Sequence, residues 1–248
     1  MGKKIAIGPK ICCAKTHIDA VPFVSLDAIA SFTAQLSALA RQHNFLLFED
    51  RKFADIGATV AAQYAGGVYN IVRWADITNA HSVPGPGVIA GLKSAIPPPP
   101  SGGGAGGAER GLLLLGEMSS AGNLGGGEYL ARTVAMARAE RDFVMGFVAQ
   151  CAIAPPPSPA GLEGQGGGGE GQGGEEEDWI VMTPGVNLGR SGDALGQQYN
   201  TPDRVVRERG CDVIIVGRGI VAAADPVAEA ERYRAAGWEA YEHRVAQS

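Results

Sequence analysis

The stretch FLLFEDRKFADIG, residues 45–57, carries an apolar segment directly into a cluster of charged side chains. Residues 45–48 predict a buried strand, and Asp50, Lys52 and Asp55 follow it with the spacing Asp-x-Lys-x-x-Asp. Carboxylate and ammonium groups are costly to bury unless they are fully paired, and neighbouring charges shift each other's pKa. Such a cluster at the end of a strand indicates a site for chemistry. The alternative is a solvated ion-pair patch at the start of a helix.

Short apolar runs with little alternation recur along the chain, which is typical of strands buried on both faces of a parallel sheet. Helical patterns lie between them. One is capped by Ser25 and ends before Asn44, and another begins at Asp225-Pro226 and is expected to end at Gly237. The alternation predicts an α/β fold, either a (β/α)8 barrel or an open doubly wound sheet. The predicted strands are residues 11–14, 45–48, 75–80, 112–115, 143–149, 179–182 and 213–216.

The position of the polar residues favours the barrel, because in a barrel the carboxyl ends of all strands converge on one mouth. Almost every predicted strand has functional-looking groups at that end. They are Lys15-Thr16-His17, Asp50 with Lys52, Asn79 with His81, Glu117 with Ser119, Gln150, Thr183-Pro184-Gly185 and Gly217-Arg218-Gly219.

A barrel needs eight strands, and only seven are found. Residues 4–7 are separated from the strand at Ile11 by three residues, whereas a parallel crossover needs about 10 to 12 or more. We therefore expect a TIM barrel that lacks its first strand, as a truncated chain or as an open barrel with two unpaired edges. The 248 residues are expected to form a single domain with flexible Gly/Pro-rich insertions at about 97–107 and 151–178.

Composition limits the classes of function. No apolar run reaches the roughly 20 residues of a membrane span and the start lacks a signal peptide, so a cytoplasmic protein without a membrane partner is expected. A net charge of −5 provides no basic stripe for nucleic acid, which leaves a small-molecule ligand. The four cysteines lack metal-binding spacing and are expected to be buried, reduced thiols. Two GxGxxG matches, at 102–107 and 166–171, lie in the insertions and do not follow a strand directly.

Six separated motifs, in order, resemble those of the fungal orotidine 5'-monophosphate decarboxylases. The resemblance runs from about Gly8 to the C-terminus, with only the insertions matching poorly. The motifs are Lys15-Thr16-His17, the run FEDRKFADIG, Asp76-Ile77-Thr78-Asn79-Ala80-His81, Met182-Thr183-Pro184-Gly185-Val186, Gly192-Asp193-Ala194-Leu195-Gly196-Gln197-Gln198-Tyr199 and Ile215-Val216-Gly217-Arg218-Gly219.

The resemblance implies a cofactor-free, metal-free barrel enzyme that converts orotidine monophosphate to uridine monophosphate and carbon dioxide in de novo pyrimidine synthesis. It also implies a homodimer with shared active sites. The implied charge row is Lys15, Asp50 and Lys52, with Asp55 and Thr59 contributed across the interface. Loss of carbon dioxide leaves a poorly delocalised carbanion, and Lys52 is the candidate that stabilises it and delivers the proton.

Substrate binding is expected at the ends of the later strands. Arg218 offers a fork of donors to a phosphate, and Gly217 lets the backbone approach it. The resemblance adds Gln197 and Tyr199 on the preceding loop and Ser119 as the group that reads the pyrimidine's amide edge. Pro184, in the motif after its strand, is also assigned to substrate binding.

The chain also departs from the family. The absent first strand would carry the aspartate that binds the ribose hydroxyls, and the insertion at 151–178 falls where a loop closes over the phosphate. His17 and His81 are interpreted as structural. Two alternatives stay open, a catalytically incomplete fragment of the same enzyme and a magnesium-dependent sibling that decarboxylates a sugar phosphate.

Overall fold

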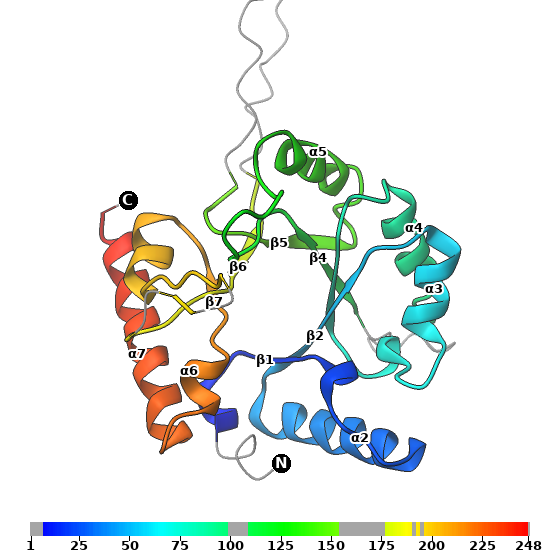
Figure 1. Ribbon diagram of the computed structural model, residues 1–248, viewed down its shortest axis with the longest axis horizontal. Coiled ribbons are helices and arrows are strands. Elements are labelled where there is room, and N and C mark those ends of the chain that lie inside the picture. Colours follow the sequence, from blue (N-terminus) through cyan, green and yellow to red (C-terminus); the bar gives the residue numbers. More distant parts are fainter. Residues whose placement is uncertain (1–6, 99–108, 154–176, 190–191, 194–195, 248) are drawn as a thin grey trace, which may run out of the picture.

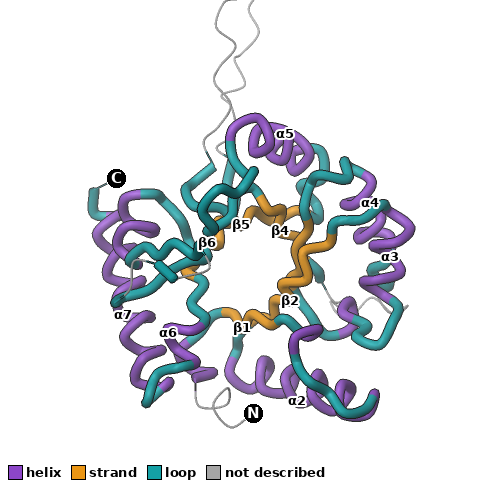
Figure 2. Tube along the Cα trace, viewed as in Figure 1, coloured by secondary structure: helices purple, strands orange, loops and turns teal. Residues whose placement is uncertain are grey.

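Each of the seven apolar runs forms a strand, and the strands pair in parallel in chain order from β1 to β7. The computed structural model describes residues 7–98, 109–153, 177–189, 192–193 and 196–247. Figure 2 shows the strands curling around a common centre, which agrees with the predicted TIM-barrel class. The strands are β1 (Cys13–Thr16), β2 (Leu46–Phe53), β3 (Ile77–Ala80), β4 (Gly111–Leu115), β5 (Val144–Val148), β6 (Ile180–Thr183) and β7 (Val213–Ile214).

The helices form an outer layer around the strands (Figure 1). They are α2 (Leu26–His43), α3 (Gly57–Ala65), α4 (Gly87–Ser94), α5 (Gly127–Arg138), α6 (Arg218–Val221) and α7 (Pro226–Val245). Short helical turns are η1 (Gly8–Lys10), η2 (Ile18–Ala20), η3 (Ile71–Arg73) and η4 (Arg204–Glu208).

The ends of α2 lie where the sequence predicts them. Ser25 Oγ accepts a hydrogen bond from the backbone N–H of Ala28, and Asn44 ends the helix in the left-handed conformation. The predicted end of α7 at Gly237 is wrong, because the helix continues to Val245. Gly237 packs against Ile214 of β7, where a Cβ would lie 3.4 Å from the Ile214 Cδ1 atom. That distance is an ordinary van der Waals contact, so packing does not require a glycine here, and the glycine does not end the helix.

Strand β2 also differs from the prediction. The sequence predicts a strand over 45–48 followed by charged residues, whereas β2 continues to Phe53 and includes Asp50 and Lys52. Pairing with β1 and then β3 carries the strand through its charged half. The charged groups are thereby held by the sheet itself.

Two apolar clusters divide the core. The larger one lies between strands and helices and includes Leu47, Leu112 and Leu114. The smaller one comes from the alternate strand positions, which face the barrel interior because side chains along a strand point to opposite faces. Its buried members are Phe48, Ile77, Leu113, Leu115, Val148 and Met182. The interior is therefore apolar beneath the mouth of the barrel.

Among the described residues, β1 pairs only with β2, and β7 pairs only with β6. The central parts of both predicted insertions and both GxGxxG matches lie outside the described residues. No helix in the described ranges is long and apolar enough to cross a membrane. The expectation that the thiols are buried is wrong for Cys12, which is exposed, and right for Cys211.

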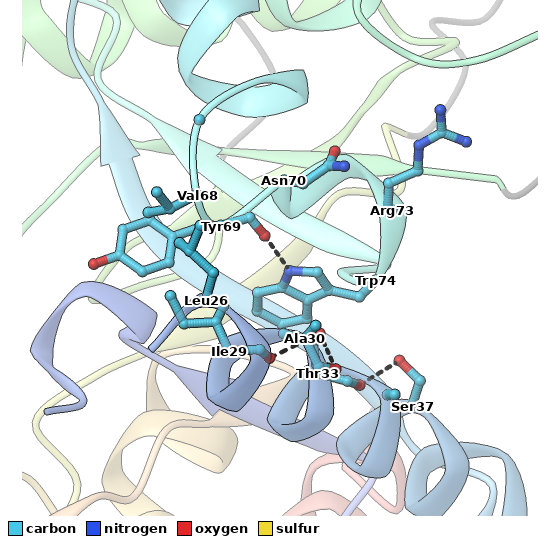
Figure 3. A pocket seen from close by; sticks show the side chains of 12 residues that line it. Leu26, Ile29, Ala30, Thr33, Ser37, Val68, Tyr69, Asn70, Arg73 and Trp74 are labelled. Atoms are coloured by element: carbon cyan, nitrogen blue, oxygen red, sulfur yellow. Dashed lines mark hydrogen bonds between the residues drawn. The ribbon is translucent and has the colours of Figure 1, made fainter. Parts of the chain in front are cut away.

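A hollow of about 550 Å³ lies outside the barrel, between α2 and the segment that joins α3 to β3 (Figure 3). Leu26 and Ile29 line it from α2, and Trp74 lines it from the opposite side. The Trp74 indole N–H donates to the backbone carbonyl of Tyr69 at 3.0 Å, which fixes the ring against the helix. None of the site residues predicted from the sequence lines this hollow.

Candidate active site

A row of three charged side chains lies at the carboxyl ends of β1 and β2. Lys15 Nζ donates to Asp50 Oδ2 at 2.7 Å, and Lys52 Nζ donates to Asp50 Oδ1 at 2.6 Å. The two ammonium groups thus share one carboxylate, whose side chain is 11% exposed. Asp50 follows Phe48 at alternate positions of β2, so this row faces the barrel interior above the apolar cluster.

The electrostatics of the row keep Asp50 ionised. Burial acts to raise the pKa of Asp50, but the charges and hydrogen bonds of Lys15 and Lys52 outweigh burial and lower the pKa to about 2. An anion held between two cations fixes both ammonium groups in place. Lys52 then presents a charged, oriented proton donor.

The backbone of Lys52 has an unusual conformation. Its φ is +53°, in the left-handed region that side-chain-bearing residues seldom adopt. The pairing of β2 with β3 shifts here, because four steps along β2 from Glu49 to Phe53 match two steps along β3 from Thr78 to Ala80. Bulges of this kind redirect side chains next to active sites.

Asn79 of β3 holds this bulge from the side. Its Oδ1 accepts the backbone N–H of Lys52 at 2.7 Å, and its Nδ2 donates to Asp50 Oδ1 at 2.7 Å. Asn79 is fully buried. One amide side chain therefore positions both charged residues of β2.

Two histidines, His17 and His81, border the row, and their interpretation as structural stays a prediction. The Lys15 ammonium group lies 2.8 Å from His17 Nε2, and this atom is 3.3 Å from Asp50 Oδ2. An ammonium group can only donate, so Nε2 accepts and the ring is neutral. Burial and then Lys15 lower the pKa of His17, and burial and then Lys52 lower that of His81. Both rings therefore lie within the field of the charged row.

Asp55 and Thr59 lie apart from the charged row of their own chain. Asp55 is exposed and accepts a hydrogen bond from the backbone N–H of Ile56 at 2.7 Å. No ion pair joins Asp55 to Lys15 or Lys52 among the described residues. Thr59 is half-buried in the first turns of α3.

A second group of predicted residues meets beyond β4 and β6. Ser119 Oγ donates to Gln197 Oε1 at 3.2 Å, and the backbone carbonyl of Ser119 accepts the N–H of Gln198 at 3.0 Å. Pro184 follows β6, and its carbonyl accepts from Gln150 Nε2 at 3.3 Å. These contacts join loops that are far apart in sequence into one surface.

The loop between these residues comes close because of a glycine. Gly185 has a φ of +79°, and a Cβ there would lie 2.6 Å from the Gln198 carbonyl oxygen and 2.9 Å from Ser119 Cβ. Any larger residue would push the two loops apart. The sequence motif that contains Gly185 has this physical basis.

Arg218 lies at the start of α6, directly after Gly217. Its side chain is 64% exposed and pairs with Asp193, at 2.7 Å between Nη1 and Oδ2. The guanidinium also lies over the Tyr199 ring, with Cζ 5.9 Å from the ring centroid. Asp193 Oδ1 accepts the N–H of Gln197, so the loop and the arginine are joined. This arrangement offers an exposed cation beside backbone N–H groups, which suits a phosphate.

The structure also identifies contributors to which the sequence assigned no role. They are Asn79, which the sequence shows only as a polar group at a strand end, and Glu49, next to Asp50. Glu49 is fully buried and accepts from Thr16 Oγ1 at 2.6 Å and from the N–H of Ile18 at 2.9 Å. In the sequence Glu49 is the first of four consecutive charged residues, 49–52, and nothing in that run distinguishes the one that is fully buried. Among the described residues, no group of three or more His, Cys, Asp or Glu side chains is arranged to hold a metal ion.

Comparison with known proteins identifies the family. The profile described as "Orotidine 5'-phosphate decarboxylase / HUMPS family" matches residues 5–233. The orotidine 5'-phosphate decarboxylase of Torulaspora delbrueckii is 51% identical over 241 residues, which cover 96% of this chain and 80% of the relative. The Saccharomyces cerevisiae enzyme of the same name is 50% identical over 243 residues, with 98% and 81% covered. The chain belongs to the orotidine 5'-phosphate decarboxylase / HUMPS family. Its resemblance to the fungal members is confirmed.

Solved structures of orotidine 5'-monophosphate decarboxylases share the fold. The Sulfolobus solfataricus protein gives a TM-score of 0.60 at 17% identity, covering 96% of this chain and 93% of that one. The Methanocaldococcus jannaschii protein, complexed with the inhibitor BMP, gives 0.57 at 20% identity, covering 94% and 90%. At these identities the likeness shows the barrel architecture alone.

Proposed function

We propose that this chain is an orotidine 5'-monophosphate decarboxylase that converts orotidine monophosphate to uridine monophosphate and carbon dioxide without a cofactor. The observation that carries the proposal is the row in which Lys15 and Lys52 share the Asp50 carboxylate, at 2.7 and 2.6 Å. Relatives about half identical to this chain carry that name. The reaction is a carbon–carbon lyase step in de novo pyrimidine synthesis.

The charged row suits the electronic demand of this reaction. The bond between the ring carbon and the carboxylate breaks, carbon dioxide leaves, and the electron pair stays on the ring carbon. A fixed ammonium group stabilises that developing negative charge and then donates its proton to the same carbon. We assign this role to Lys52. Asp50 orients Lys52 through their ion pair, and Lys15 completes the network.

The second group of residues suits the remainder of the substrate. Arg218, with Gly217, Gln197 and Tyr199, would bind the phosphate, since its exposed guanidinium can exchange Asp193 for phosphate oxygens. Contacts to this non-reacting end can contribute stabilisation that is realised in the transition state. We assign the amide edge of the pyrimidine to Ser119, which lies against Gln197, and a neighbouring substrate contact to Pro184.

We further infer a cytoplasmic homodimer in which Asp55 and Thr59 complete the partner's site. Asp55 supports this because it is exposed and makes no ion pair with Lys15 or Lys52 of its own chain among the described residues. Mixing the Lys52→Ala and Asp55→Ala variants tests the assignment. Activity that reappears on mixing supports a shared site, and two variants that stay inactive together contradict it.

Decarboxylation of orotidine monophosphate by the full chain in excess EDTA tests the main proposal. We expect uridine monophosphate and carbon dioxide in equal amounts, with Lys52→Ala inactive. Glu177→Gln is the matched control, since Glu177 forms a two-point ion pair with Arg138 on a different part of the fold. Activity lost in EDTA and restored by magnesium indicates the metal-dependent sibling. A folded chain without turnover indicates an incomplete enzyme.

A further inference from the structure

Glu49 and Asp50 are adjacent carboxylates that point to opposite faces of β2. Asp50 faces the barrel interior and holds two lysines, whereas Glu49 faces the outer layer. Glu49 is fully buried there, without a lysine or arginine partner among the described residues. Its side chain instead accepts the Thr16 hydroxyl at 2.6 Å and the N–H of Ile18 at 2.9 Å.

These two contacts bracket the functional end of β1. Thr16 and Glu49 are direct partners in the strand register. Thr16 and Ile18 alternate with Lys15 and His17, so the outward positions are anchored to Glu49 while the inward ones contact Asp50. In the described part of the chain, β1 has a strand neighbour on one side only. Its position therefore depends strongly on contacts made through β2.

We propose that Glu49 is a positioning residue that holds the end of β1 from the outer face, so that Lys15 and His17 stay in contact with Asp50 on the inner face. The inference rests on the proposed function, because its kinetic consequence is expressed in decarboxylation. Glu49 does not touch the reacting atoms. It acts through Lys15.

The ionisation of Glu49 is consistent with this role. Burial raises its pKa to about 6, and the hydrogen bonds from Thr16 and Ile18 oppose the rise. At neutral pH the carboxylate is charged, and both anchoring hydrogen bonds are then charge-assisted, which makes them shorter and stronger than neutral ones.

A double-mutant cycle separates positioning from general stabilisation. Glu49→Leu removes both acceptors at similar volume, and we expect kcat/KM to fall about 100-fold, the cost of misplacing a catalytic group by about 1 Å. In a Lys15→Ala background, we expect the same substitution to lower kcat/KM less than about threefold, because residues that act as a unit are non-additive. Equal losses in both backgrounds would overturn the inference. Glu49→Gln keeps one oxygen that can accept the Ile18 N–H and places an N–H beside the Thr16 hydroxyl, which can accept it, so we expect this variant to recover most of the activity.

Thr16 provides a milder variant in case Glu49→Leu does not fold. Thr16→Val removes one anchoring bond with little change in shape, whereas Thr16→Ser keeps the hydroxyl. We expect a loss of kcat/KM of about tenfold for valine and near wild-type values for serine, since one net hydrogen bond to a charged group corresponds to about that factor. Valine and serine variants with equal kcat/KM would contradict the role of the hydroxyl.

A measurement that does not require turnover distinguishes failure of this inference from failure of the proposed function. The pKa of His17 is followed by NMR in the wild type, Thr16→Val and Glu49→Leu, with His17→Gln to assign the signal. Removing the negative charge of Glu49 alone would lower the pKa of His17. If His17 moves away from Lys15 and becomes more exposed, its pKa would rise towards 6.5, because burial and Lys15 are the two largest causes that lower it. We expect a rise in both variants, and an unchanged or lowered value would overturn the proposal even in a chain without activity.

Discussion

The side chain of Asn79 holds the backbone of Lys52 in a left-handed conformation. Asn79 Oδ1 accepts the Lys52 N–H at 2.7 Å, and Lys52 has a φ of +53°. Residues held in sparsely populated conformations cost about 1–3 kcal/mol each and persist only when their surroundings compensate. The compensation here comes from Asn79 on the neighbouring strand. The same amide orients the Lys52 backbone and donates a hydrogen bond to Asp50.

Replacing Asn79 with alanine therefore tests how the lysine is positioned. Asn79→Ala leaves the Lys52 N–H without its acceptor, and an unpaired buried donor costs about 1–3 kcal/mol. We expect kcat to fall about 100-fold, as for a misplaced catalytic group, with a similar loss in the free energy of unfolding. Steady-state kinetics and urea unfolding measure the two effects. Asp212→Ala is the control, since Asp212 Oδ2 accepts the backbone N–H of Val181 at 2.9 Å near the amino end of β6, and its loss should affect stability without changing kcat.

The same conformation predicts an inverted stability order at position 52. Glycine adopts positive φ without penalty, whereas a residue with a Cβ pays about 1–2 kcal/mol in the left-handed region. We expect Lys52→Gly to be more stable than Lys52→Ala by about 1 kcal/mol, with both variants inactive. Chemical unfolding of the two variants measures the difference. Greater stability of the alanine variant would show that the bulge is absent in solution.

The pH dependence of stability follows from the pKa shift of Glu49. Its pKa is raised in the folded state from 4.5 to about 6, so the folded chain favours the protonated form. The resulting stabilisation is fully present below pH 4.5 and is lost as the pH rises through about 6, a change of about 2 kcal/mol. Glu49→Gln cannot titrate. We expect the wild type to lose about this amount relative to the variant between pH 4 and 7, and parallel unfolding profiles would contradict the shift.

Asp50 titrates in the opposite direction and in a lower range. Its pKa is lowered from 3.8 to about 2, so its stabilisation is present above pH 3.8 and is lost as the pH falls towards 2. We expect Asp50→Asn to remove this acid-sensitive part of the stability curve, and it should also abolish the ion pair that orients Lys52. Unfolding measured between pH 2 and 5 checks the first effect. If the Asp50→Asn variant still loses stability between pH 5 and 2, that loss comes from other carboxyl groups.

Arg218 provides a test at the other end of the substrate. Arg218→Ala removes the exposed guanidinium, and we expect kcat/KM to fall about 10- to 100-fold, the range of a charged hydrogen bond of about 1.5–3 kcal/mol. Added methylguanidinium should restore part of the activity if the lost group binds phosphate. Arg232→Ala is a suitable control, because Arg232 is an exposed arginine that pairs with Glu229 on α7. A similar loss in the control would point to a general charge effect.

Much of the architecture is present in local sequence patterns. The apolar runs became strands because their side chains are buried on both faces, and Ser25 and Asn44 bound α2 through hydrogen bonding and backbone conformation confined to a few residues. The charged run that begins directly after the apolar residues 45–48 indicates a strand end that carries functional groups. Such features depend on neighbours in the chain and can be predicted without a fold. The continuation of α7 through Gly237 could not be predicted, because packing of the following turns, where Ala240 is buried, stabilises the helix beyond the glycine.

The sequence alone determined the barrel class, the strand ends that carry polar groups, and the family to which those groups belong. Tertiary structure decided how the groups are held: the bulge at Lys52, the amide of Asn79 bridging to it, the outer-face contacts of Glu49 and the position of His17 beside Lys15. The physical reason is that these hydrogen bonds join strands 27 to 33 positions apart in sequence, or depend on which face of a strand a residue occupies. A one-dimensional pattern records that a carboxylate is present, and only the packed strands determine which groups bind it.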